Sequence, residues 1–193
     1  MRRLVKTSFL TPSRNVVEEA YSIINSHGLV VGVTDTLYGI FASPFCRGCV
    51  EKVYMVKRRG DKPIPILCSS IDIVVNLTAN INDSIIRFME SVWPGPVTVI
   101  LPVDKGSGIA ENIHLGSYKV GFRVPAAKLP QLLAKNVGGA ITGTSANISG
   151  LEPARDIGEA IAQLGDNIEL YIDSGKAPIG VPSTVLELSL IHI

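Results

Sequence analysis

The chain has 193 residues, of which 46% are hydrophobic and 18% are charged, and its formal net charge is +1 at pH 7. This length and composition are typical of one compact domain with a buried core and exclude a disordered polypeptide, so we expect a single domain over residues 1–193. The near-zero net charge argues against a protein whose main activity is to wrap nucleic acid, because such binding neutralises many phosphates.

The apolar runs are too short to cross a membrane. The longest uncharged ones, residues 28–33 and 97–101, are the size of a strand, whereas a membrane helix needs about 20 residues. The N-terminus begins with Arg2 and Arg3 but lacks the apolar segment and the small-residue cleavage site of a secretory signal. We therefore expect no membrane association and a cytoplasmic location.

Helix and strand patterns alternate along the chain. In chain order, the patterns predict a helix over residues 13–26, a strand over 29–33, a helix over 48–57, a strand over 64–68, a helix from residue 82, strands over 97–101 and 120–124, a helix over 129–136, a strand over 140–143, a helix over 157–164, and strands over 169–172 and 184–188. Pro65 indicates that the strand over 64–68 lies at a sheet edge. The fold class expected is α/β, with helices packed on a mixed parallel and antiparallel sheet.

A polar loop directly follows the first predicted strand. It runs from Thr34 to Gly39 with the sequence TDTLYG, and the carboxyl end of a buried strand is where open α/β sheets bind ligands. Its hydroxyl groups suit a small polar ligand, and Asp35 suits either the turn or a ligand amine. An ordinary turn, in which Asp and Thr bond their own backbone, explains the same residues.

Lys57 stands on the apolar face of the second predicted helix. Positions 50, 53, 54 and 57 follow the helical i, i+3, i+4, i+7 spacing, so the lysine extends the stripe that faces the sheet. A charge that points inward is expected to meet an anion. The alternative is that Lys57, Arg58 and Arg59 form a solvated basic cluster at a helix C-terminus, where the helix dipole favours cations.

Three later segments place polar groups at strand ends. Residues 142–150 read TGTSANISG, and such small residues let backbone N–H groups approach a phosphate or a ribose, although ordinary turns share this composition. Arg123 stands in an otherwise apolar strand, so it needs a carboxylate partner from the protein or from a substrate. Ser183 belongs to the PSTV segment that opens the last strand.

Cys46 and Cys49 form a Cys-x-x-Cys motif, and the chain has one further cysteine. The spacing fits a redox motif or half of a zinc site. A zinc site needs four ligands, however, and the three histidines stand at no ligand-like spacing. We therefore favour two small residues that open a helix, and we predict no metal site.

The usual nucleotide-binding and nucleophile motifs are missing from the sequence, so the chemistry must rely on cations and on positioning. Six segments, in this order, resemble motifs of the YrdC/TsaC family of threonylcarbamoyl-AMP synthases. The segments are TDTLYG from Thr34, KRR from Lys57, WPGPVT from Trp93, GFRVP from Gly121, SAN from Ser145 and PSTV from Pro182. The resemblance covers residues 15–188, which is nearly the whole chain.

The resemblance implies the YrdC-like, DHBP synthase-like fold, in which helices pack on a twisted mixed sheet. It also implies two groups of binding residues. Thr34, Arg123 and Ser183 would bind L-threonine, and Lys57, Arg59, Ser145 and Asn147 would bind ATP. Lys57 and Arg59 would also be catalytic, because they neutralise phosphate charge.

The family reaction joins L-threonine, bicarbonate and ATP into threonylcarbamoyl-AMP and pyrophosphate. A partner transferase then uses the product to modify the adenosine beside the tRNA anticodon. Threonine carbamate is already an anion, so its attack on the α-phosphorus needs charge neutralisation and in-line positioning rather than a strong base. The resemblance implies Mg²⁺ as the companion of ATP, and it leaves weak tRNA or double-stranded RNA binding as an expectation.

Two other functions stay open. One is an RNA-binding module, which the near-zero net charge disfavours, and the other is a carbamoylation factor with another acceptor or donor.

The sequence also departs from the family pattern. Val33 replaces a proline before Thr34, and residues 67–68 read LC where the family often has a histidine. The chain stops at residues 189–193, where the family usually continues into a segment with arginine and glycine. We expect either a reduced affinity for ATP or a longer natural chain.

Overall fold

The computed structural model describes residues 2–60 and 62–188, and within these ranges ten strands form two five-stranded sheets. The first sheet has the order β1 (Arg3–Lys6), β9 (Leu170–Asp173), β2 (Val30–Val33), β3 (Tyr38–Phe41) and β8 (Thr144–Ser145). The second sheet has the order β10 (Thr184–Glu187), β5 (Val97–Pro102), β6 (Lys119–Arg123), β4 (Ile66–Cys68) and β7 (Ala140–Thr142). Each sheet contains two parallel and two antiparallel pairs.

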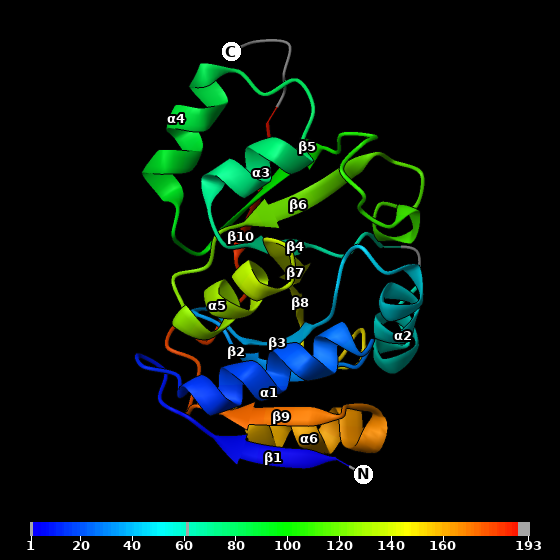
Figure 1. Cartoon of the computed structure of the whole chain (residues 1–193), viewed down its shortest axis with the longest axis vertical. Helices are drawn as coiled ribbons and strands as arrows, with labels where there is room; N and C mark the ends of the chain where they lie inside the picture. The colour runs from blue at the N-terminus through cyan, green and yellow to red at the C-terminus, as the bar shows by residue number, and fades with distance from the viewer. Residues whose placement is uncertain (1, 61, 189–193) are drawn as a thin grey trace.

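The helices pack around the two sheets, which lie one above the other along the long axis of the molecule (Figure 1). Their bounds are α1 (Arg14–Asn25), α2 (Arg47–Lys57), α3 (Ile71–Leu77), α4 (Asp83–Val92), α5 (Lys128–Asn136) and α6 (Ile157–Leu164), with short 3₁₀ helices η1 (Glu111–Ile113) and η2 (Gly165–Asn167). Helix α5 contacts β2 of the first sheet as well as β4 and β7 of the second. It therefore spans the junction between the sheets.

The predicted α/β class with mixed strand directions is confirmed, but the strands form two sheets rather than one. The expectation that the strand after Pro65 lies at a sheet edge is wrong, because β4 lies between β6 and β7. Pro65 precedes β4 instead of lying within it, so its missing N–H removes no bond from the ladder. Strands β1, β3 and β8 and helix α3 were not predicted.

Strand β2, in the middle of the first sheet, is buried on both faces. Val30 belongs to a core with α1 and α5, whereas Val31 and Val33 belong to a larger core on the other face that includes α2 residues. Gly32 lies between them, and a Cβ there would meet the Leu129 side chain of α5 at 2.8 Å. The continuous apolar run of β2 follows from this burial on both faces, and the glycine allows α5 to approach closely.

The chain passes between the two sheets next to Gly143. This residue separates β7 of the second sheet from β8 of the first. The Thr142 hydroxyl joins the sheets at the same point, because it donates to Ile40 O at 2.9 Å and accepts the Ala42 N–H at 3.0 Å. The position of residues 143–145 is therefore determined by both sheets.

A second passage is the β9–β10 connector, residues 174–183. The Tyr38 hydroxyl donates to Gly175 O at 2.6 Å and accepts the Ser174 N–H at 3.2 Å. Further along, Ile179 N–H donates to Asp35 O and Gly180 N–H donates to Thr36 O. The connector is thus fixed to β3 and to the loop that precedes it, residues 34–37.

None of the helices in the described ranges combines the length and the apolar composition that a bilayer span requires. The expectation about the end of the chain concerns residues 189–193, which lie outside the described residues.

We expect Tyr38→Phe to lower the free energy of unfolding by about 1 kcal/mol, the net value of a typical hydrogen bond, and to loosen the β9–β10 connector. Urea denaturation measures the first effect, and amide hydrogen exchange of residues 174–180 measures the second. Tyr171→Phe is the matched control, because its hydroxyl donates to Gly165 O at 2.7 Å, outside the connector. Equal exchange in the two variants would contradict the role given to Tyr38.

Candidate functional site

The cavity where the two sheets meet collects most of the residues that the sequence singled out. It has a volume of about 340 Å³, which is within the range of small-ligand pockets. Five of the seven predicted site residues line it: Thr34, Arg59, Arg123, Ser145 and Ser183. Lys57 and Asn147 are buried behind the wall rather than in it.

Arg123 brings a buried positive charge from the second sheet to the loop of the first. Its Nη1 donates to Thr36 Oγ1 at 3.1 Å and lies 3.3 Å from Asp35 Oδ1, while its Nη2 lies 3.5 Å from Thr34 Oγ1. Burial lowers the pKa of Arg123, and the Asp35 carboxylate partly offsets this effect. The sequence left the partner open, and the structure supplies a protein carboxylate.

The Thr34 hydroxyl organises the hairpin loop between β2 and β3. Its Oγ1 donates to Leu37 O at 2.8 Å and accepts the N–H groups of Thr36 and Leu37 at 3.1 and 3.2 Å. The ordinary-turn explanation of this segment is therefore correct. It does not exclude the ligand-binding explanation, because Thr34 and Thr36 also line the cavity.

Lys57 ends helix α2 and points inward, as its spacing predicted, with only 1% of its surface exposed. Its Nζ donates to Ser145 O at 2.5 Å, to Asn147 O at 2.8 Å and to Asn147 Oδ1 at 3.2 Å. The acceptors are oxygens of the protein itself, so Lys57 holds the loop that carries Ser145. Burial, with a smaller contribution from Arg59, lowers the pKa of Lys57 to about 7.

Arg59 lies on the cavity side of the same chain segment. Backbone oxygens of Lys62 and Pro63 accept from its Nε at 2.9 Å and from its Nη2 at 2.8 Å. Its Nη1 lies 3.4 Å from Thr144 Oγ1 across the cavity wall. Burial lowers the pKa of Arg59, and the fixed geometry aims a second guanidinium at the cavity.

Ser145 and Ser183 bring hydroxyl groups to the cavity. Ser145 Oγ donates to Asn147 Oδ1 at 2.5 Å, and Asn147 Nδ2 donates to Ile148 O and Leu151 O. Asn147 therefore shapes the loop. Ser183 Oγ is hydrogen-bonded to Thr98 Oγ1 of β5 at 2.8 Å, so the end of the connector is fixed to the second sheet.

Sequence reasoning counted Thr36 among the hydroxyl groups of its loop and named the segment of Thr144, but it assigned neither residue to the site. Their hydroxyl oxygens lie next to the guanidinium groups of Arg123 and Arg59. The signal in the sequence that could have identified them was their position beside Thr34 and Ser145 in loops that follow strands. Two arginines, Arg59 and Arg123, are among the described residues that line the cavity, and none of those residues carries a carboxylate. The cavity therefore suits an anionic ligand.

The lowered pKa of Lys57 predicts a dependence of stability on pH. Between pH values of about 7 and 10.5 the unfolded chain binds more protons than the folded one, so the stability of the wild type rises with pH. Methionine does not titrate. We expect the free energy of unfolding of the wild type to rise relative to Lys57→Met by up to about 1.4 kcal/mol per pH unit. Urea denaturation across this range measures the difference, and parallel curves would show that Lys57 keeps its charge.

Comparisons with known proteins identify relatives of this chain. Residues 22–192 match the family model of Sua5, YciO and YrdC, which is described as "Telomere recombination". A protein of Idiomarina loihiensis named threonylcarbamoyl-AMP synthase is 31% identical over 88% of this chain and 91% of its own length. One of Bacillus subtilis with the same name is 30% identical over 93% of this chain and 52% of its own length.

The fold agrees as well. The crystal structure of P. abyssi Sua5 in complex with L-threonine matches with a TM-score of 0.91 and 27% identity, over 96% of this chain and 54% of that one. The chain thus spans about half the length of the B. subtilis and P. abyssi proteins and nearly all of the I. loihiensis protein. Because the family match covers most of the sequence, the chain belongs to the Sua5/YciO/YrdC family.

Proposed function

We propose that this chain is a threonylcarbamoyl-AMP synthase, which condenses L-threonine, bicarbonate and ATP and releases pyrophosphate. The observation that carries the proposal is the meeting of Arg59 and Arg123, from different parts of the chain, in one cavity rich in hydroxyl groups. The two reacting species, threonine carbamate and ATP, are both anions, so they repel each other until fixed cations neutralise them. The names of the relatives point to the same reaction.

Arg123 is the proposed site for the carboxylate of L-threonine. A guanidinium carries five N–H donors, and its bonds to Thr34 and Thr36 leave donors that can face the cavity. Asp35 keeps this buried cation in place. The threonine complex of P. abyssi Sua5 supports a threonine site in this fold. Ser183, on the connector, is the proposed third contact.

The nucleotide is proposed to bind on the other side of the cavity, against Arg59 and Ser145. In the reaction, the threonine nitrogen first forms a carbamate with bicarbonate-derived CO₂. A carbamate oxygen then forms a bond to the α-phosphorus, and the bond to the departing pyrophosphate breaks. Arg59 neutralises phosphate charge during this step. Lys57 and Asn147 act indirectly, because Lys57 donates to the backbone oxygen of Ser145 and Asn147 accepts a hydrogen bond from the Ser145 hydroxyl.

Mg²⁺ is proposed to enter with ATP as part of the substrate. The cavity suits this arrangement, since its described lining residues offer hydroxyl oxygens, such as those of Thr144 and Ser145, but no carboxylate. Oxygen atoms are the ligands that Mg²⁺ prefers, and the phosphates supply them. The ion lowers the charge of the triphosphate.

The product is proposed to pass to a tRNA threonylcarbamoyltransferase, which would place it on the adenosine beside the anticodon. Weak binding of tRNA or double-stranded RNA by the chain itself is a further proposal.

The strength of RNA binding distinguishes the enzyme from an RNA-binding module. In a gel shift at physiological salt, tight tRNA binding without ATP consumption would favour the module. Carbamoyl phosphate, offered in place of bicarbonate and threonine, would reveal a carbamoylation factor.

We expect Arg123→Lys to lower kcat/KM for L-threonine by about 10- to 100-fold, because a charged hydrogen bond contributes about 1.5–3 kcal/mol and lysine cannot reproduce the fork of the guanidinium. The measurement is pyrophosphate release from ATP that depends on threonine and bicarbonate, with the product identified by mass. A thermal melt establishes that the variant is folded.

Lys119→Ala is the matched control for this variant. Lys119 begins the same strand, β6, but is exposed and pairs with Glu187 at 2.6 Å. We expect its kcat/KM to equal that of the wild type. If Arg123→Lys kept full activity with threonine, the assignment of the threonine site would be wrong. If the wild type released no pyrophosphate at all, the proposed reaction itself would be wrong.

A further inference from the structure

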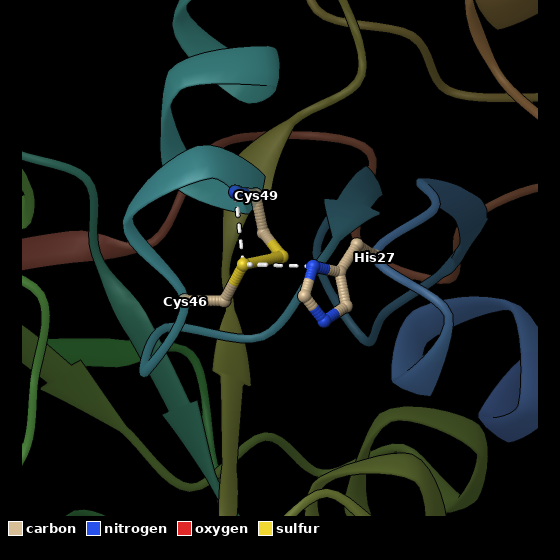
Figure 2. A group of neighbouring side chains, drawn as sticks. All are labelled: His27, Cys46 and Cys49. Atoms are coloured by element: carbon tan, nitrogen blue, oxygen red, sulfur yellow. Dashed lines mark hydrogen bonds between the residues drawn. A yellow bond between two sulfur atoms is a disulfide. The ribbon is translucent and has the colours of Figure 1, made fainter.

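A group of three side chains lies at the start of α2, outside the cavity described above. Cys46 and Cys49 form a disulfide there, and the Nδ1 atom of His27 lies 3.6 Å from the Cys46 sulfur (Figure 2). The expectation that the two cysteines open a helix is confirmed, because Cys46 caps α2. The histidines stand at no ligand-like spacing in the sequence, but the fold brings His27 next to the two cysteines. His27 follows the end of α1 in a left-handed conformation with a φ of 66°.

The two sulfur atoms are not equivalent. Cys46 is partly exposed, whereas Cys49 is completely buried in the core beneath α2. An external nucleophile can therefore reach Cys46 more readily than Cys49. Thiol–disulfide exchange depends on which sulfur is accessible, so the exposure alone assigns the attacked sulfur to Cys46 and the leaving sulfur to Cys49.

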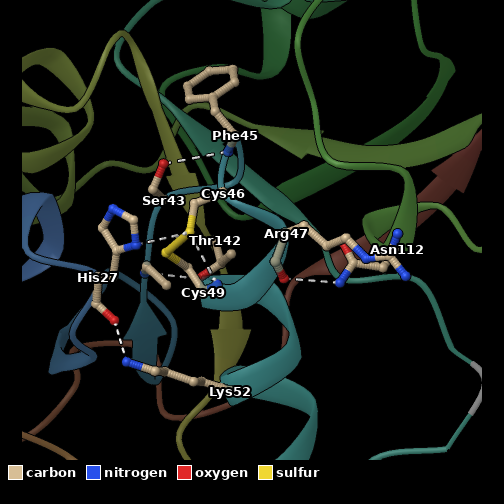
Figure 3. Close-up of a disulfide and its surroundings, with 10 residues drawn as sticks. His27, Ser43, Phe45, Cys46, Arg47, Cys49, Lys52, Asn112 and Thr142 are labelled. Carbon is tan, nitrogen blue, oxygen red and sulfur yellow. Dashed lines mark hydrogen bonds between the residues drawn. A yellow bond between two sulfur atoms is a disulfide. The ribbon is translucent and has the colours of Figure 1, made fainter.

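The surroundings stabilise negative charge on Cys46. The Cys49 N–H donates to Cys46 Sγ at 3.1 Å, which places the sulfur at the N-terminus of an 11-residue helix. A helix N-terminus and nearby cations both favour a thiolate. Lys52 brings a cation to this group, because its Nζ donates to the carbonyl oxygen of His27 at 2.7 Å and so also fixes His27 (Figure 3).

A cavity of about 250 Å³ opens beside this group. His27, Ser43 and Cys46 line it together with Asn25 and Asn136. The cavity therefore presents the more exposed sulfur, the imidazole and several polar groups to one small volume. A low-molecular-weight thiol with polar substituents matches these features, because it can place its sulfur against Cys46 while its polar groups bind the amides.

We propose that Cys46 and Cys49 form a thiol–disulfide exchange site, in which a small thiol docks in this cavity and attacks Cys46. The disulfide closes a loop of only four residues, so it restricts the unfolded chain less than a bridge between distant segments would. A structural role is correspondingly weak. The proposal is independent of the threonylcarbamoyl-AMP synthase activity.

The exchange balances with two thiols as the reductant. The first thiol gives its proton to His27, and its sulfur forms a bond to Cys46 while the bond between Cys46 and Cys49 breaks. The electron pair remains on Cys49, which then takes a proton. The second thiol attacks the sulfur of the first and releases Cys46, which takes up the proton that the second thiol loses. The protein disulfide and two thiols thus become a protein dithiol and one small disulfide, and the reverse reaction oxidises the pair.

The first experiment titrates the folded wild-type chain with defined ratios of reduced to oxidised glutathione. After an acid quench, a maleimide label and peptide mapping report each cysteine. We expect Cys46 and Cys49 to become labelled together as the ratio rises. Cys68 is an internal control, because it is fully buried and burial raises the pKa of its thiol, so it should react only after denaturation.

The second experiment separates the two sulfurs in single-cysteine variants. With oxidised glutathione as the probe, Cys46 in Cys49→Ser should form a mixed disulfide at least about 10-fold faster than Cys49 in Cys46→Ser. Adding His27→Gln should slow the reaction of Cys46 several-fold. Asn25→Ala is the matched control for His27, because Asn25 lines the same cavity, and it should keep the rate within about 2-fold.

Three results would overturn the proposal. If glutathione reduced the pair only in the denatured chain, the disulfide would be a structural bridge. If the two single-cysteine variants reacted at equal rates, the assignment to Cys46 would be wrong. If the reduced chain bound one zinc ion and both cysteines then resisted the label, the group would be a metal site. Elemental analysis of the reduced protein tests the last case, because His27, Cys46 and Cys49 supply three of the four ligands that zinc needs.

Discussion

A buried ion pair between the two sheets is the constraint on which the candidate site depends. Arg123 at the end of β6 meets Asp35 in the loop after β2, and the hydroxyls of Thr34 and Thr36 lie next to its guanidinium. An isolated charge is costly to bury, so each partner requires the other. The two sheets therefore cannot separate at this point without exposing or orphaning a charge, and the cavity between them keeps its shape.

Two passages of the chain complete the frame around that pair. The short passage at Gly143 brings Thr144 and Ser145 to the cavity, and the Thr142 hydroxyl joins the sheets beside it. The long passage, the β9–β10 connector, brings Ser183 from the other side. Because both passages are hydrogen-bonded to the first sheet, the cavity walls come from segments distant in sequence yet have little freedom to move apart.

The sequence predicted the α/β class, most of the helices and strands, and five residues that share one cavity. These depend on local patterns and on motifs, which a single chain displays. It did not predict the division into two sheets, since strand pairing depends on contacts between distant segments. It also misplaced Pro65, because the pattern could not show that β4 begins after the proline. The neighbourhood of His27 and Cys46 was missed for the same reason: His27 follows α1 and Cys46 precedes α2, and the fold alone brings them together.

Lys57 and Arg59 show how two cations separated by one residue acquire different tasks. Lys57 is the last residue of α2 and stays on its buried face, where three oxygens of the 145–147 loop surround it. Arg58 then adopts a left-handed conformation, with a φ of 48°, and the chain turns so that Arg59 faces the cavity. Helical spacing indicated correctly that Lys57 points inward. It could not indicate that backbone oxygens of the 145–147 loop would accept the hydrogen bonds of Lys57, because the positions of backbone atoms cannot be inferred from a pattern of residue types. Arg59 thus lines the cavity directly, whereas Lys57 fixes the loop that brings Ser145 to it.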